Sequence, residues 1–148
     1  MKISTKGRYG VRALVDLSIN GKSGSPVFLS DIARRQGISE KYLEQIATQL
    51  QRAGLVKTMR GRKGGYLLNK SENEIKLNEI IKILEGPICV VNCVSEPDTC
   101  SRSSLCSTRD IWSILSNKIE EVLSGYTLAD LAMLQEEKTG NETSIYYI

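Results

Sequence analysis

The chain has 148 residues with a net charge of +3, and 41% of its residues are hydrophobic, which fits one globular domain or a small domain with a dimerisation arm. No apolar stretch approaches the roughly 18 residues of a membrane span, and the N-terminus carries no secretory apolar segment, so we expect a cytoplasmic protein with no membrane contact. Residues 1–70 hold 14 Lys and Arg against 4 Asp and Glu, whereas residues 71–148 hold 6 against 13. So basic a first half favours a nucleic-acid partner over a merely solvated basic face.

The first half of the chain predicts a helix-turn-helix. Apolar residues at helical spacing between positions 6 and 20 indicate a first helix. A short second helix begins near Ser30 and ends at Gln36-Gly37, and Ser39 is a suitable N-cap for a longer third helix that ends at Ala53-Gly54. A short helix, a tight turn and a longer helix form the pattern of a helix-turn-helix.

A β-hairpin is expected directly after these helices. Residues 55–59 and 66–68 read as two strands, and the Gly-rich basic segment 60–65 reads as the tip between them. The expected fold is therefore mainly α with a small β-hairpin, a winged helix-turn-helix domain over residues 1–86.

The second half predicts a loop followed by dimerisation helices. A helix near residues 77–84 leads into a loop at 87–107, and a long helix with a wide apolar stripe runs from Thr108 to about Ser124. Because little else in this half could cover that stripe, we expect a second copy of the chain to cover it. A short helix from Thr127 to about Leu134 completes the dimerisation segment 108–135, and residues 136–148 read as a polar C-terminal tail.

Two groups of side chains are candidates for DNA contact. The start of the third helix offers side chains that could reach base edges in the major groove, and Glu44 and Gln45 suit cytosine and adenine respectively. The hairpin tip carries cations that repel one another unless an anion lies against them. Its glycines could let the hairpin enter a narrow groove of DNA, or they could simply provide the positive φ angles that the turn requires. With phosphate contacts from the first helix, the candidates are Lys41, Tyr42, Glu44, Gln45, Arg60, Arg62, Lys63, Lys2, Lys6 and Arg8.

All four cysteines fall within eighteen residues, at Cys89, Cys93, Cys100 and Cys106, and the chain contains no histidine. In a cytoplasmic protein such clustering points to a metal or iron–sulfur site rather than to disulfides. Thiolates are the soft ligands that iron–sulfur clusters and zinc prefer. Uncoordinated redox-active thiols are a further alternative.

The chain strongly resembles the bacterial winged-helix regulators typified by the iron–sulfur cluster regulator IscR and the cysteine-metabolism repressor CymR. The resemblance covers nearly the whole chain and is carried by segments 1–10, 37–39, 42–45, 54–56, 60–61 and 64–68. It implies a homodimeric transcriptional regulator that binds a palindromic element of double-stranded DNA. It matches Arg60 to the family's wing arginine and Lys41, Tyr42, Glu44 and Gln45 to its recognition helix.

In the cluster-binding branch the resemblance implies three cysteine ligands, matched here by Cys93, Cys100 and Cys106, and favours a [2Fe–2S] cluster over [4Fe–4S]. The branch has a histidine three residues after the last cysteine, where this chain has Arg109, which stays protonated and cannot ligate. Cys89 is the first candidate for the fourth ligand. An oxygen ligand, from Glu85, Glu96, Asp98 or Asp110, or a group of a second subunit is the other.

The alternative function is a cluster-free repressor of cysteine metabolism. The terminal Tyr146-Tyr147-Ile148 resembles that branch, in which the signal would come from the enzyme O-acetylserine sulfhydrylase. An enzyme is not expected, because the chain lacks histidine, a phosphate-binding Gly-rich loop and a nucleophile motif.

Overall fold

The computed structural model describes residues 2–145, and within 141–145 it describes the backbone alone. The elements are α1 (Thr5–Asn20), α2 (Leu29–Gln36), α3 (Glu40–Arg52), β1 (Val56–Met59), β2 (Gly65–Leu68), α4 (Leu77–Glu85), α5 (Asn92–Ser95), α6 (Ser107–Ser124) and α7 (Leu128–Ile145). Over these described residues the only sheet is the antiparallel pair β1–β2. The predicted mainly α-helical fold with a small β-hairpin is confirmed.

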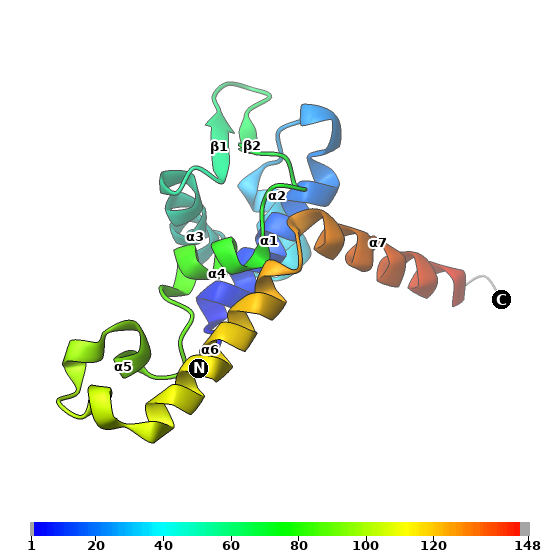
Figure 1. Ribbon diagram of the computed structural model, residues 1–148. Coiled ribbons are helices and arrows are strands. Elements are labelled where there is room, and N and C mark those ends of the chain that lie inside the picture. The colour runs from blue at the N-terminus through cyan, green and yellow to red at the C-terminus, as the bar shows by residue number, and fades with distance from the viewer. Residues whose placement is uncertain (1, 146–148) are drawn as a thin grey trace.

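The core lies where α1, α3 and α4 meet, beneath the hairpin (Figure 1). Leu128, the first residue of α7, is fully buried in the same core, so α7 begins as part of this body. The side chains with almost no exposed surface are Leu14, Leu43, Ile46, Leu55, Ile75, Ile80, Ile81, Leu84 and Leu128. Their burial fixes the positions of α3 and α4 relative to α1.

Local capping explains the turn between α2 and α3. Gly37 ends α2 in the left-handed conformation (φ 64°), and the Ile38 N–H then donates to the Ala33 carbonyl oxygen at 3.0 Å. The Ser39 hydroxyl accepts from the Tyr42 N–H at 3.3 Å and so caps α3. The expected helix-turn-helix follows from these two caps.

The hairpin pairs Val56 with Leu68 and Met59 with Gly65, and it is joined to the segment before α2 by a bridge between Val27 and Tyr66. Gly65 has a φ of 146°, and a Cβ atom there would lie 2.7 Å from the Val27 carbonyl oxygen. Only glycine allows this close approach, so Gly65 lets the start of β2 pack on the segment before α2.

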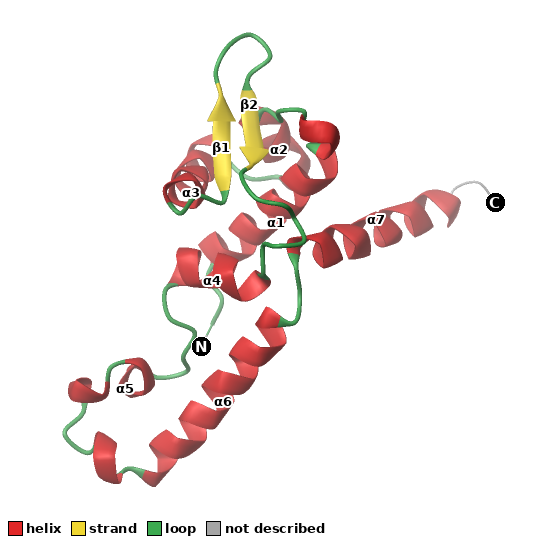
Figure 2. Cartoon of the chain, turned by 45° about the horizontal axis from the view of Figure 1, so that its top comes forward, coloured by secondary structure: helices red, strands yellow, loops and turns green. Residues whose placement is uncertain are grey.

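Figure 2 shows that α6 projects from the body and that the cysteine loop lies at its far end, where the helix begins. An ion pair between Lys82 of α4 and Glu120 of α6 joins the two helices. The loop is not wholly irregular, because it contains α5 and short 3-10 turns at Pro97–Thr99 and Ser103–Leu105. No described helix is both long and apolar enough to cross a membrane.

The C-terminal helix differs from the sequence prediction. A short helix to about Leu134 and a polar tail from residue 136 were expected, but α7 continues to Ile145. The segment Gln135-Glu136-Glu137-Lys138 consists of strong helix formers, and the Lys22–Glu136 ion pair at 2.5 Å ties it to the body. Polarity was therefore a poor guide here, because an exposed helix needs no apolar stripe. Tyr146-Tyr147-Ile148 lies outside the described residues.

Candidate DNA-binding surface and cysteine loop

The start of α3 presents three of its four candidate side chains to solvent. Lys41, Glu44 and Gln45 are exposed, as base-reading residues must be. Tyr42 is half-buried, and its ring packs edge-on against Tyr9 of α1 with a centroid separation of 6.2 Å. Tyr42 therefore also holds α3 on α1.

The wing tip presents a compact group of free cations. Arg60, Arg62 and Lys63 are exposed, and none of them makes an ion pair within the described part of the chain. The turn is closed by the Gly64 N–H, which donates to the Gly61 carbonyl oxygen at 2.9 Å, and Gly61 has a φ of 108°. The tip glycines therefore serve the turn itself.

The wing and α3 lie side by side in Figures 1 and 2, and β1 contacts α3. Burial, together with the nearby Glu44 carboxylate of α3, raises the pKa of the Tyr66 hydroxyl on β2. The structure therefore unites the two predicted base-contacting groups on one side of the molecule.

The basic N-terminal arm lies elsewhere. Lys2 and Arg8 are exposed and Lys6 is half-buried, but the N-terminus lies beside α4 and α6, at the opposite end of α1 from the wing (Figures 1 and 2). The arm still adjoins α3 at one point, because Arg8 immediately precedes Tyr9, whose ring packs on Tyr42.

Glu85 fastens this arm to the end of α4, a role that the sequence did not reveal. Its carboxylate accepts from the Ser4 N–H at 3.2 Å and from the Ser4 hydroxyl at 2.5 Å, and Ser4 is the N-cap of α1. Gly7 makes room, because a Cβ atom there would overlap the Glu85 carboxylate. Glu85 was one alternative for a fourth cluster ligand, and in this structure its carboxylate is engaged with Ser4. Ser4 and Glu85 are 81 positions apart in the sequence, and no local sequence pattern predicts a contact over that distance.

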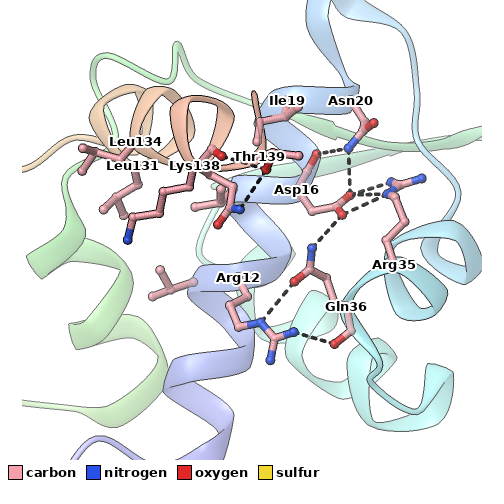
Figure 3. A pocket seen from close by; sticks show the side chains of 13 residues that line it. Arg12, Asp16, Ile19, Asn20, Arg35, Gln36, Leu131, Leu134, Lys138 and Thr139 are labelled. Atoms are coloured by element: carbon pink, nitrogen blue, oxygen red, sulfur yellow. Dashed lines mark hydrogen bonds and ion pairs between the residues drawn. The ribbon is translucent and has the colours of Figure 1, made fainter. Parts of the chain in front are cut away.

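A second contact that the sequence did not predict holds α2 on α1. The Asp16 carboxylate is buried, with 3% of its side chain exposed, and it accepts two bonds from Arg35 Nε and one from Arg35 Nη2 at 2.5–3.2 Å. Gln36 and Asn20 also donate to Asp16, as Figure 3 shows. The bond to Asp16 raises the pKa of Arg35, which keeps this guanidinium charged.

The cysteine loop holds four free, half-buried thiols, at Cys89, Cys93, Cys100 and Cys106. Among the described residues, no group of three or more Cys, Asp or Glu lies close enough together to hold a metal ion. The donor set fits an iron–sulfur cluster chemically, since four unoxidised thiols lie in one short segment.

The loop is anchored to α6 at two points. Arg109 Nε donates to the Cys93 carbonyl oxygen at 2.7 Å, and the Val90 N–H donates to the hydroxyl of buried Ser116 at 3.1 Å. Cys106 is the N-cap of α6, and hydrogen bonds from the Thr108 hydroxyl and the Arg109 backbone N–H lower the pKa of its thiol. A change in the loop would therefore act first on α6.

The α2–turn–α3 unit, the adjoining hairpin and its free cations define a winged helix-turn-helix DNA-binding protein. The Rrf2 family model, described as "Iron-dependent Transcriptional regulator", matches residues 3–133. The chain belongs to the Rrf2 family of transcriptional regulators, and it is a regulator rather than an enzyme.

Individual relatives agree with this assignment. The transcriptional regulator IscR of Cronobacter sakazakii is 39% identical over 92% of this chain and 83% of its own length. Among solved structures, T. potens IscR is 41% identical with a TM-score of 0.76, covering 93% of this chain and 90% of that one. CymR, the global cysteine regulator of B. subtilis, is 38% identical with a TM-score of 0.75, covering 90% of this chain and 98% of that one.

Proposed function

We propose that the chain is a cytoplasmic homodimeric regulator that binds a palindromic promoter element and senses iron–sulfur or redox status through its cysteine loop. The observation that carries the proposal is the gathering of four free thiols in a segment fastened to α6. Cys93, Cys100 and Cys106 would hold a [2Fe–2S] cluster, and Cys89 is the first candidate for the fourth ligand. The bound cluster would supply a redox-responsive centre. The family model, which describes an iron-dependent transcriptional regulator, supports this function.

The α6 surface supports the homodimer. Ile114 is 58% exposed and Val122 is 61% exposed, on a helix whose apolar stripe also includes Ile111 and Leu115. A stripe of this kind is stable in water when a second helix covers it. Antiparallel or crossing α6 helices would place two wings and two α3 helices on one duplex, which fits a palindromic site.

An optical spectrum tests the cluster directly. Protein purified without oxygen, or reconstituted with iron and sulfide, is expected to absorb visible light and to contain iron and acid-labile sulfide in a 1:1 ratio. A colourless protein after reconstitution would contradict the cluster assignment while leaving DNA binding intact.

That contrary result would favour the second candidate, a cluster-free regulator of cysteine metabolism that binds O-acetylserine sulfhydrylase. Two observations favour it: the similarity to CymR, and the absence of an assembled metal site among the described residues. The terminal residues expected to bind that enzyme, Tyr146-Tyr147-Ile148, lie outside the described residues.

The wing prediction concerns Arg60. Arg60→Ala is expected to weaken binding to a duplex selected from a random-sequence library by about 1–3 kcal/mol, because Arg60 is exposed and unpaired at the tip. If Arg60 lies against phosphate, the slope of log affinity against log salt should also fall by about one. Fluorescence anisotropy at several salt concentrations measures both quantities.

Arg102→Ala is the matched control for this variant. Arg102 is an exposed arginine in the cysteine loop, at the far end of α6 from the wing. Equal losses for the two variants would show general electrostatic attraction and would refute a specific role for the wing.

A further inference from the structure

A cleft separates α7 from the α1–α2 side of the helix-turn-helix. Its volume is about 670 Å³, within the range of roughly 300–1,000 Å³ typical of small-molecule sites. Val11, Val15 and Ile19 line it from α1, and Leu131 and Leu134 line it from α7. Leu134 is 42% exposed, so apolar surface is left open to solvent inside the cleft.

The walls of the cleft are held in place independently of any ligand. Leu128 and Ala132 anchor the start of α7 in the core, and the Lys22–Glu136 ion pair holds the next turns. On the other wall, the buried Asp16 carboxylate, bonded to Arg35, holds α2 on α1. A cleft between fixed walls is a preformed site, which lowers the entropic cost of binding.

The charged side chains that line the cleft favour the binding of an anion. Among the side chains that the structure describes, its lining includes Arg12, Arg35 and Lys138 but a single carboxylate, Asp16, which already accepts hydrogen bonds from Arg35, Gln36 and Asn20. The Lys138 ammonium makes no ion pair within the described residues, and Figure 3 shows Lys138 on the α7 side and Arg12 on the α1 side. Arg12 uses its Nε and Nη2 atoms on Gln36, which leaves Nη1 for a ligand.

We propose that this cleft is a binding site for a small amphipathic carboxylate, whose apolar body lies on the valine and leucine side chains and whose anionic group meets Lys138 and Arg12. Two cationic groups beside a strip of aliphatic side chains from α1 and α7 suit a monoanion with an apolar body better than a phosphate. This site lies apart from the cysteine loop and goes beyond the proposed cluster function.

The site adjoins the end of α2, which gives it a route to DNA binding. Arg12 Nη2 donates to the Gln36 carbonyl oxygen at 2.6 Å, and Gly37 to Ser39 then lead directly into α3. An anion that draws Arg12 away from Gln36 would loosen the turn that positions α3. The ligand would then lower the affinity for DNA, and DNA would lower the affinity for the ligand by the same factor.

The test uses 3-phenylpropionate as the probe and 3-phenylpropan-1-ol as its neutral counterpart. In methyl NMR spectra of the full chain, the carboxylate is expected to shift the methyl signals of Val15 and Leu131 saturably, because an aromatic ring close to them changes their shielding. The methyl signal of Ile114 on α6 should stay in place. The alcohol is expected to bind at least tenfold more weakly.

Lys138→Glu is expected to weaken carboxylate binding at least tenfold, whereas Lys57→Glu, an exposed lysine on β1, should leave it unchanged. Equal binding of acid and alcohol, shifts centred on α6, no saturable shift at all, or equal effects of the two variants would overturn the site. Saturating carboxylate should also weaken DNA binding severalfold, and unchanged DNA affinity would overturn the link to α2. A colourless protein or a wing variant with normal affinity would contradict the proposed function and leave this site untouched.

Discussion

Asp16→Ala is expected to lower the free energy of unfolding by about 1.5–3 kcal/mol, the usual contribution of hydrogen bonds to a charged group, because the Arg35 side chain that remains is 34% exposed. Asp16 is almost fully buried and accepts hydrogen bonds from Arg35, Gln36 and Asn20. Its removal would leave the Arg35 guanidinium without its partner against the α1–α2 interface. Urea unfolding followed by circular dichroism measures the loss.

The matched control is Glu121→Ala, which breaks the Lys118–Glu121 pair, whose side chains are both 68% exposed. Solvent screening limits such a pair to about 0–1 kcal/mol. Asp16→Asn keeps the shape and some of the hydrogen bonds, so it should fall between the two. It also provides a measurement if Asp16→Ala does not fold. Similar losses for Asp16→Asn and Glu121→Ala would show that the Asp16 network adds little.

Asp16 also shows what could not be predicted from the sequence. Spacing identified α1, and its apolar positions divide into a core face with Leu14 and Leu17 and a cleft face with Val11 and Val15. An aspartate in such a helix would ordinarily be placed on the solvated face. Asp16 is buried because Arg35, nineteen residues away, returns beside it. Periodicity reports which face is apolar, but it cannot report a partner brought in by tertiary packing.

The candidate sites were predictable to different degrees. The exposed residues of α3 and the wing follow from local signals, namely the Ser39 cap and the glycines of the hairpin. The clustering of the thiols was visible too, but their spacing could not show whether they converge. The anchors of the loop, Arg109 on Cys93 and Ser116 on Val90, are contacts between distant residues. The helix beyond Leu134 was missed because polarity was given more weight than helix propensity.

Replacement of a cluster ligand is expected to have an all-or-none effect. Alanine at Cys93, Cys100 or Cys106 should each abolish the visible absorbance of anaerobically reconstituted protein, because each variant lacks a thiolate that the cluster needs. Ser101→Ala, adjacent to Cys100 and exposed, is the control and should keep the full spectrum. An unchanged spectrum in any one of the three cysteine variants would remove that residue from the ligand set.

The fourth ligand can be identified by rescue. Cys89→Ala should also lose the absorbance if Cys89 completes the site. Arg109 occupies the position where the cluster-binding branch has histidine, and its side chain lies beside Cys93, since Nε bonds the Cys93 carbonyl oxygen. Arg109→His added to Cys89→Ala should therefore restore a cluster, with a shifted spectrum because nitrogen replaces sulfur on one iron. A normal spectrum in Cys89→Ala alone would instead assign the fourth position to a carboxylate or to the second subunit.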